Sequence, residues 1–470
     1  MIIRNFAELE LDGKKVTTNN ILNLGMKKSF SITTICFLIS GILVAVVFNS
    51  CKTTQKTVDY KDLSYLYNPT KSPINPRYNV INQTDDASTL SVMFASSDLF
   101  FSEANPQGVP TASVLITVKL YSMNQGRSIA DTAVLNLSIV KETGKSEYIF
   151  NMPLKVEKGT EYLAEIKILD RLRLLITQDF VQFNTLSYTN RYNFRVQSHF
   201  DKNELFSPVL RLDEYINLLY SRGHIDSLFI SFYKPFREVP DPPSMLLPEK
   251  TLDYDPQQVV AIPYSDSLPI MFPKEGIYLC SVDRNIKDGF TFLNLGSTYP
   301  RVTTPEKMIE PLVFLASQDE MADLKSAVKP KAALDDFWIK CGGNVDKARE
   351  LIRIFYTRVL YSNYYFTSYK EGWRTERGMV YIIYGPPDKV YKTSEGEAWG
   401  YKKPVIKSKW GGRFAVTNSY LYFNFRKREN VFSDNDFYLS RSETLVTYWD
   451  KAIENWRKGI VFRLDNPKGI

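Results

Sequence analysis

The spacing of apolar residues changes near residue 300, and this change limits the folds open to the chain. Before it, short runs alternate apolar and polar positions with a period of two, which is the pattern of half-buried strands. After it, apolar residues recur every three or four positions, as they do in amphipathic helices. The chain has 470 residues, enough for several domains. Strands followed by helices therefore predict separate β-rich and helix-containing domains.

Residues 79–187 predict an antiparallel β-sandwich. The strand candidates are short, regularly spaced and separated by turn formers such as Asn124-Gln125-Gly126 and Lys158-Gly159. We expect strands over residues 90–94, 113–121, 132–140, 147–156 and 162–169.

Residues 188–302 predict a second β-rich, sandwich-like domain. A proline-rich stretch between Pro235 and Pro248 interrupts it, and proline cannot continue a central strand. This stretch is either a long connecting loop or a partner-binding segment. We expect strands over residues 194–198, 227–233, 258–262, 276–282 and 290–295.

Residues 303–470 predict a mixed α+β domain. Thr304-Pro305-Glu306 has the features of a helix N-terminus, and helical spacing follows over residues 332–340 and 345–360 and after Ser442. Strands are expected over residues 379–384, 397–401, 420–426 and 430–439. The predicted fold is thus multidomain, with two N-terminal antiparallel β-sandwich-like domains followed by this α+β domain.

The first 50 residues predict export. Lys27 and Lys28 precede an apolar run over residues 35–48, which is shorter than the roughly 20 residues of a membrane-spanning helix. Phe48-Asn49-Ser50-Cys51 resembles a lipobox, which predicts a lipid on Cys51. A plain secretory peptide cut near Ser50 is the alternative. Lys27 and Lys28 directly follow Met26, so translation is expected to start at either Met1 or Met26.

Residues 51–78 are expected to form an extended tether, since they are polar and contain three prolines. The residues after Cys51 carry no acidic pair, which favours an outer-membrane position facing the periplasm. We therefore expect residues 1–50 to be an upstream extension and signal peptide, and the membrane to be a partner through the lipid.

Composition excludes several classes of function. The net charge of +7 is modest, and the basic excess lies towards the C-terminus, where it is either a solvated surface or a contact for anionic lipid or cell-wall phosphate. His199 and His224 are the only histidines, and phosphate-binding glycine loops are absent. We expect no cofactor, no metal and no nucleic-acid partner. Cys280 and Cys341 are expected to be buried free thiols, and Asp434-Asn435-Asp436 a hairpin turn.

A motif in the third region carries a family resemblance. Gly372-Trp373-Arg374-Thr375-Glu376-Arg377-Gly378 is followed by Gly385-Pro386-Pro387-Asp388 and then by Glu397-Ala398-Trp399-Gly400-Tyr401. This arrangement resembles the GWxTD-domain proteins of Bacteroidota-type bacteria over about residues 303–465. The resemblance implies fold and exported location more than chemistry, because the family's function is largely unknown. Glu376 departs from it, since the family name specifies aspartate.

Two interpretations of the motif follow. It either shapes a packed turn between Gly372 and Gly378, or presents Trp373, Arg377 and Trp399 to a ligand or partner. Glu376 and Arg377 are expected to form a charge pair. The candidate binding or motif residues are Gly372, Trp373, Thr375, Glu376, Arg377, Gly378, Gly385, Pro386, Pro387, Asp388 and Trp399, and none is predicted to be catalytic.

The leading functional hypothesis is a non-enzymatic envelope lipoprotein that contacts a protein or glycan through its C-terminal domain. A hydrolase or carbohydrate-active enzyme with a site around Glu376, Arg377 and Asp388 is the first alternative. An accessory subunit of an outer-membrane secretion or gliding assembly is the second.

Overall fold

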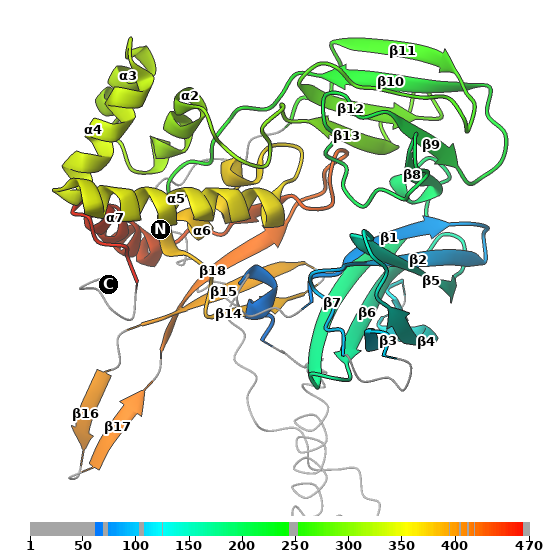
Figure 1. Cartoon of the computed structure of the whole chain (residues 1–470), viewed down its shortest axis with the longest axis horizontal. Helices are drawn as coiled ribbons and strands as arrows, with labels where there is room; N and C mark the ends of the chain where they lie inside the picture. Colours follow the sequence, from blue (N-terminus) through cyan, green and yellow to red (C-terminus); the bar gives the residue numbers. More distant parts are fainter. Residues whose placement is uncertain are drawn as a thin grey trace, which may run out of the picture. The chain divides into compact units, whose positions relative to one another are not determined.

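The computed structural model describes residues 62–68, 74–102, 108–124, 126–243, 252–393, 395–403, 406–410, 413–417 and 419–463 (Figure 1). The expected signal peptide, Cys51 and the first part of the tether lie outside the described residues. Within the described ranges, no helix combines the length and apolarity that crossing a membrane requires.

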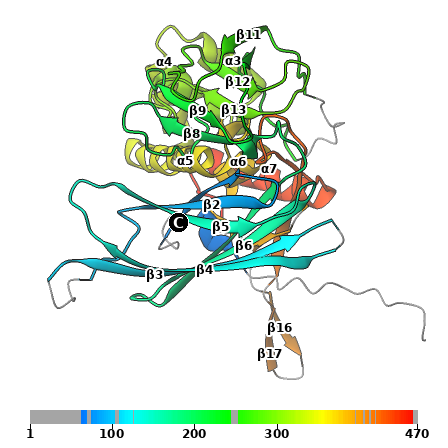
Figure 2. The same cartoon turned by 90° about the vertical axis from the view of Figure 1, so that its right-hand side faces the viewer.

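The first β-rich region contains two antiparallel sheets. One has the strand order β1-β2-β5 and the other β4-β3-β6-β7, and Figure 2 shows them as two layers. Val92, Ile116 and Ile166 belong to the core between them. The strands are β1 (Arg77–Asn82), β2 (Ala87–Ala95), β3 (Thr111–Ser122), β4 (Ser128–Val140), β5 (Glu147–Lys155), β6 (Glu161–Asp170) and β7 (Leu175–Asn184).

All five strands expected there are present, whereas β1 and β7 were not expected. Both alternate poorly: β7 runs Leu-Ile-Thr-Gln-Asp-Phe-Val-Gln-Phe-Asn, and β1 has only six residues. β7 pairs with β6 from Asp170↔Leu175 to Glu161↔Asn184, so the tertiary ladder supplies what the local pattern lacks.

The second β-rich region is also antiparallel. A four-stranded sheet has the order β11-β10-β12-β13, and β8 pairs with β9. Cys280 lies in its core without a disulfide partner, as expected. The strands are β8 (Phe194–Ser198), β9 (Ile216–Tyr220), β10 (Ser227–Tyr233), β11 (Gln258–Pro263), β12 (Gly276–Ser281) and β13 (Phe290–Asn294).

The C-terminal region combines helices with a four-stranded antiparallel sheet of order β14-β15-β18-β19. Its helices are α2 (Pro305–Ile309), η3 (Glu310–Phe314), α3 (Gln318–Ser326), α4 (Pro330–Gly342), α5 (Val345–Phe366), η4 (Gly372–Arg374), α6 (Glu376–Tyr384) and α7 (Glu443–Arg457). Its strands are β14 (Lys389–Lys392), β15 (Gly396–Lys402), β16 (Ile406–Trp410), β17 (Arg413–Thr417), β18 (Tyr420–Lys427) and β19 (Phe437–Leu439), with β16 and β17 forming a separate hairpin.

The strand expected over residues 379–384 is wrong, because these are the last six of the nine residues of helix α6. Every residue of α6 from Arg377 to Tyr384 is buried. A continuous apolar run that is buried on all sides has no polar face to reveal its period, so its sequence fits a strand and a helix equally. The strand expected over residues 430–439 is also too long, since only Phe437–Leu439 pair.

Residues 62–68 do not form part of a solvated tether. Ser64–Tyr67 make a 3₁₀ helix, η1, and Leu63 and Tyr67 join the C-terminal core. The Leu63 backbone N–H donates to the Val390 carbonyl at 2.8 Å, which fixes η1 beside β14. Apolar and aromatic side chains in this stretch gain more by burial than by hydration, which explains the departure from an extended tether.

Candidate functional site

Thr375 starts helix α6 and gives the motif its local geometry. Its hydroxyl accepts a hydrogen bond from the Gly378 backbone N–H at 3.1 Å and donates to the Gly372 carbonyl at 2.7 Å. The first contact caps one of the free N–H groups of the helix end. The second holds the preceding 3₁₀ turn against the same residue, so Thr375 joins η4 to α6.

Gly372 and Gly378 allow backbones to approach where no side chain fits. A Cβ on Gly372 would lie 2.0 Å from the Ser362 carbonyl oxygen, and one on Gly378 would lie 2.0 Å from the Gly372 carbonyl oxygen. Any other residue at either position would displace backbone. The two glycines thus bracket a tight turn, as the sequence predicted, and dock it on α5.

Trp373 is an internal side chain. It is 1% exposed, packs edge-on against Phe314, and its backbone N–H donates to the Asn363 side-chain oxygen at 3.0 Å. The Arg374 guanidinium lies 4.1 Å from the centre of the indole ring, which adds a cation–π contact.

Arg374 joins two regions of the chain. It donates to the carboxylates of Glu371 and Glu310 and, at 2.8 Å, to the Arg237 carbonyl in the proline-rich stretch after β10. Its side chain is 6% exposed. Arg374, which occupies the x position of the GWxTD pattern, therefore connects the C-terminal region to the second β-rich region.

Arg377 and Glu397 form a buried ion pair. The Arg377 Nη1 lies 3.2 Å from the Glu397 Oε1, and the two side chains are 2% and 4% exposed. The guanidinium also lies 3.8 Å from the centre of the Phe437 ring and donates to the Asn435 carbonyl at 3.1 Å. The expected pair between Glu376 and Arg377 is wrong, because consecutive helix residues point in different directions.

Three further groups complete the contacts of Glu397. The Trp399 indole N–H donates to Oε2 at 2.9 Å, the Tyr67 hydroxyl donates to Oε1 at 2.7 Å, and the Lys392 ammonium lies 3.9 Å from Oε1. We call Glu397, Arg377, Trp399, Tyr67 and Lys392 the Glu397 network. It unites α6, β14, β15 and the segment from the expected tether.

Electrostatics keep the Glu397 carboxyl ionised. Burial alone would raise its pKa, but the charges of Arg377 and Lys392 and the hydrogen bonds from Tyr67 and Trp399 outweigh burial and hold the pKa below its usual value. Burial and the neighbouring carboxylate together raise the pKa of the Tyr67 hydroxyl, so it remains a hydrogen-bond donor.

Glu376 faces a different arginine. Its two carboxylate oxygens lie 2.9 and 3.0 Å from the Arg441 Nη2. Burial raises the pKa of the Glu376 carboxyl, although the Arg441 charge opposes this. As the first residue of α6, Glu376 also lies at the helix end that favours negative charge. Glu376, whose side chain is one methylene longer than the aspartate of the family name, is thus held by the ion pair with Arg441.

The second part of the motif ends α6 and starts the sheet. Gly385 has a positive φ of 82°, and its carbonyl accepts from the Tyr401 hydroxyl at 2.9 Å. Pro386 is exposed and Pro387 is buried. The Asp388 carboxylate accepts from the Lys402 backbone N–H at 2.8 Å, which positions β14 against β15. This segment redirects the chain as the sequence predicted, but from a helix instead of a strand.

The aromatic and cationic residues of the motif are inaccessible to a partner. Trp373, Arg377 and Trp399 are 1%, 2% and 0% exposed. The structure brings Arg377 and Trp399 together through Glu397, whereas Trp373 packs separately against Phe314. Sequence reasoning missed Tyr67 and Lys392. Tyr67 is 330 positions from Glu397 and Lys392 is five positions from it, and no local pattern links either residue to that carboxylate. The burial of Trp373, Arg377 and Trp399 favours the interpretation of the motif as a packed turn over a partner site.

A hollow with charges of both signs lies beside this turn, between the second β-rich and C-terminal regions. Burial lowers the pKa of its Lys370 to about 8. The Lys370 ammonium donates to the Glu238 carbonyl at 3.1 Å. The charged residues that line the hollow are Arg237, Glu275, Lys307, Glu310, Lys370 and Glu371.

The remaining candidates hold ordinary contacts. The His199 Nδ1 lies 3.1 Å from the Asn217 side-chain oxygen, and His224 forms an exposed contact with Asp226. Asn435 donates to the Thr367 carbonyl at 2.9 Å, and Asp436 accepts from Asn430 at 2.9 Å. Asp434-Asn435-Asp436 lie in the connection between the antiparallel strands β18 and β19, in agreement with the expected hairpin turn.

Comparison with known proteins identifies one family. The sequence model of the GWxTD domain matches residues 276–458, so the match begins within the second β-rich region, at β12, instead of near residue 303. No curated protein matches the chain. A calcium-binding mutant of Bacteroides uniformis beta-glucuronidase 2 shares 15% identity over 23% of this chain and 13% of that chain, with a TM-score of 0.16. That similarity is too low to bear on fold or activity.

Proposed function

We propose that this GWxTD-domain-containing protein is a membrane-anchored envelope lipoprotein with a non-enzymatic, structural or binding role. Its lipid would be attached to Cys51 after removal of the signal peptide, and it would face the periplasm from the outer membrane. The GWxTD domain would serve as a rigid unit that is joined to the preceding β-rich regions and presents a surface to a protein or glycan.

The observation that carries this proposal is the internal use of the motif. Its charged side chains pair with other residues of the chain: Arg374 with Glu310 and Glu371, and Arg377 with Glu397. Buried charges of this kind need partners to persist, and here the partners come from the fold itself. A motif whose buried charged groups are paired in this way supports a role in shaping the domain.

The hydrolase alternative has less support. It would use Glu376, Arg377 and Asp388 as the reacting groups. Glu376 instead contacts Arg441, and Asp388 positions a strand. The secretion or gliding alternative is a special case of an envelope binding role, and no contact in the described residues favours it over others.

Lipidation is the first part to test. Cells expressing the wild-type chain or Cys51→Ser would be labelled with a palmitate analogue, and the N-terminal peptide would be analysed by mass spectrometry. We expect an acylated peptide that begins at Cys51 and no label on the variant. A wild-type peptide that begins at another residue without lipid would overturn the anchored assignment.

The binding role is tested by crosslinking in intact envelopes. Arg237→Glu reverses a charge at the hollow, and Arg349→Glu is a matched control, because each arginine is mostly exposed and makes one carboxylate contact. We expect specific crosslinked products that the first variant loses and the second retains. Turnover of a cell-wall or peptide substrate that disappears in folded Glu376→Gln would instead establish an enzyme.

A further inference from the structure

The turn between β6 and β7 exposes apolar side chains to an unusual degree. Its sequence is Asp170-Arg171-Leu172-Arg173-Leu174-Leu175-Ile176. Turns normally carry glycine, proline or short polar residues, which tolerate exposure. Here Leu174 is 78% exposed and Ile176 is 63% exposed, and Leu172 and Leu175 each expose more than two fifths.

Neighbouring segments extend this apolar surface. β3 pairs with β4 at Thr111↔Val140 and with β6 at Val114↔Asp170, so Val140 lies at the same end of the sheet as the turn. Phe100 lies beside it, because the Arg173 guanidinium is 5.8 Å from the Phe100 ring centre. We call this surface the apolar end; it comprises Phe100, Val140, Leu172, Leu174, Leu175 and Ile176.

The turn is held in a fixed conformation. The Asp170 carboxylate accepts from the backbone N–H groups of Leu172 at 2.9 Å and Arg173 at 3.0 Å. It also pairs with the Arg173 side chain, which in turn donates to the Asp98 carbonyl at 2.7 Å. Leu174 adopts a positive φ of 54°, a conformation uncommon for residues other than glycine. The apolar side chains are therefore presented outward by a defined scaffold.

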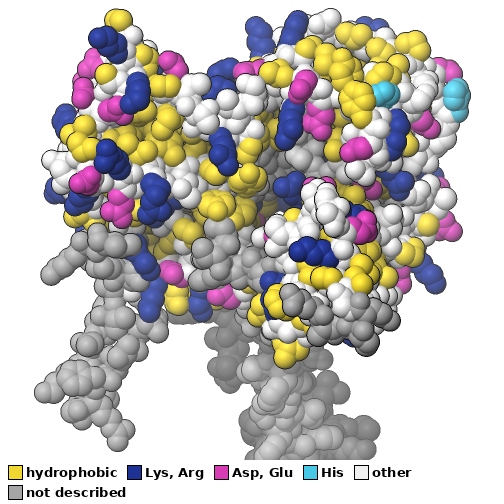
Figure 3. Space-filling model, viewed as in Figure 1, with side chains coloured by type: hydrophobic (Ala, Val, Ile, Leu, Met, Phe, Trp, Pro, Cys, Tyr) yellow, Lys and Arg dark blue, Asp and Glu magenta, His cyan; other side chains and the backbone are white. Residues whose placement is uncertain are grey.

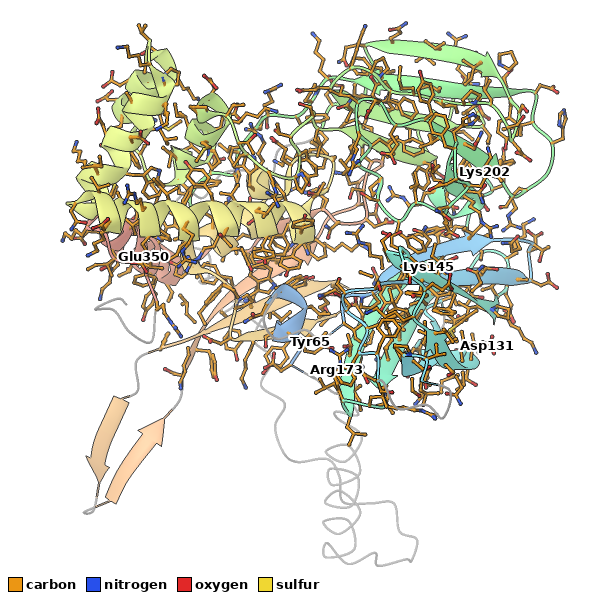
Figure 4. All side chains as sticks on the ribbon, in the orientation of Figure 1. Tyr65, Asp131, Lys145, Arg173, Lys202 and Glu350 are labelled. Carbon is orange, nitrogen blue, oxygen red and sulfur yellow. The ribbon has the colours of Figure 1, made fainter. Side chains whose placement is uncertain are left out.

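Figure 3 shows hydrophobic side chains at the lower end of the β6–β7 pair, and Figure 4 labels Arg173 there and Tyr65 on the neighbouring η1. The Tyr65 hydroxyl donates to the Gln178 carbonyl at 2.5 Å and accepts from the Gln178 N–H at 2.7 Å. Gln178 is two residues from Ile176 on β7. The segment 62–68 is thus hydrogen-bonded to the strand that carries the apolar end.

The length of chain between Cys51 and Asp62 places the apolar end within reach of a membrane if Cys51 carries the proposed lipid. Residues 52–61 separate Cys51 from Asp62, so a lipid on Cys51 keeps Asp62 within roughly 40 Å of the bilayer. The exposed Arg171 and the partly exposed Arg173 suit anionic headgroups, and leucine and phenylalanine suit the boundary with the acyl chains. Arginine can extend its charge to the headgroups while its stem stays with apolar neighbours.

We propose that the apolar end is a membrane-docking surface that inserts Leu172, Leu174 and Ile176 into the headgroup region of the bilayer. This inference rests on the proposed lipid anchor and goes beyond it, since it gives the folded part of the protein a second contact with the same membrane. The anchor raises the local concentration of the turn at the bilayer, so even a weak second contact would be occupied for much of the time.

The test uses the full processed chain in vesicles of phosphatidylethanolamine and phosphatidylglycerol. An environment-sensitive fluorophore is placed on Leu174→Cys or, as a matched control, on Phe200→Cys, because both positions are 78% exposed. Cys280 and Cys341 are buried and should not react. We expect nitroxide-labelled lipids to quench the Leu174→Cys probe about threefold or more above the control. Leu172→Cys is the substitute if Leu174→Cys does not fold.

Docking is measured by fluorescence quenching and the lipid by mass spectrometry of the N-terminal peptide, so the two proposals are tested independently. Equal quenching at both positions in acylated protein would overturn docking while leaving the anchor intact. If the purified protein proves to carry no lipid, the anchor is overturned; the probe is then placed in a Cys51→Ser background, so that only the chosen position is labelled, and selective quenching there would still support docking. Absence of both would overturn both proposals.

Discussion

Arg377 on α6 and Glu397 on β15 meet at 3.2 Å in the interior of the C-terminal region, and neither side chain is more than 4% exposed. Each belongs to a different part of the motif, so their contact joins the two parts in the fold. The pair ties the capped helix to the sheet, and Tyr67 adds a segment that precedes both β-rich regions. One buried carboxylate therefore joins η1, α6 and β15, three separate segments of the chain.

Removal of either partner should be strongly destabilising. Glu397→Gln leaves the Arg377 charge buried without its counterion, and Arg377→Met leaves Glu397 with only the more distant Lys392 as a counterion. We expect each change to lower the free energy of unfolding by about 3–5 kcal/mol. The double variant should lose less than the sum of the two. Urea denaturation of all four proteins measures this. Lys331→Ala is the control: it removes an exposed pair with Asp335 and should change the midpoint little. Additive effects of Arg377→Met and Glu397→Gln would show that Arg377 and Glu397 are not energetically coupled.

Acid should remove the contribution of Glu397. Its folded pKa lies below the unfolded value, so the unfolded chain binds the proton first as the pH falls. The stabilisation is complete above an unfolded pKa of about 4.3 and is lost as the pH falls through the folded pKa. We expect the stability difference between wild type and Glu397→Gln to be constant from pH 7 to 5 and to shrink below that. Urea midpoints against pH measure it, and a difference that grows in acid would contradict the assignment.

Gly378→Ala should destabilise the protein although alanine favours helices. The added Cβ would overlap the Gly372 carbonyl, which costs about 3 kcal/mol or more if the turn must shift. Gly343→Ala is the control: it has a positive φ of 76° and open space around its Cβ position, so only about 1 kcal/mol is expected. Thermal unfolding followed by circular dichroism compares them. Equal losses would mean that close packing of the turn is unimportant.

Tyr67→Ala should destabilise the C-terminal region from a distance in sequence. The centre of the Tyr67 ring lies within 5.6 Å of the ring centres of Tyr365, Phe366 and Trp399. Loss of the ring leaves a cavity, which we expect to lower the free energy of unfolding by about 3–5 kcal/mol. Tyr67→Phe should cost about 1–3 kcal/mol, because only the hydrogen bond to Glu397 disappears.

Tyr188→Ala, at a residue that is 59% exposed, is the control for Tyr67→Ala and should unfold like wild type. Tryptophan fluorescence during urea unfolding reports on both, since Trp399 lies beside Tyr67. A Tyr67→Ala protein with the wild-type midpoint would show that residues 62–68 are dispensable for the C-terminal core.

Local signals were sufficient for much of the fold. The strands expected over residues 194–198 and 227–233 coincide with β8 and β10, and the tight turn between Gly372 and Gly378 is present. Such features depend on side-chain alternation, turn residues and caps, which neighbouring positions in the chain determine. The free, buried state of Cys280 and Cys341 also followed from the sequence.

The sequence by itself determined the order of β-rich and helical regions and the place of the motif; tertiary structure decided how the motif is used. Residues 379–384 are apolar throughout, and only burial on all sides by α5, α7 and the sheet selects a helix there. Likewise, Arg377 could pair locally with Glu376, yet it pairs with Glu397 twenty residues away. The physical reason is the same in both cases: desolvation makes three-dimensional neighbours outweigh sequence neighbours, because a buried charge or apolar surface is stable only beside the partner that the fold brings to it.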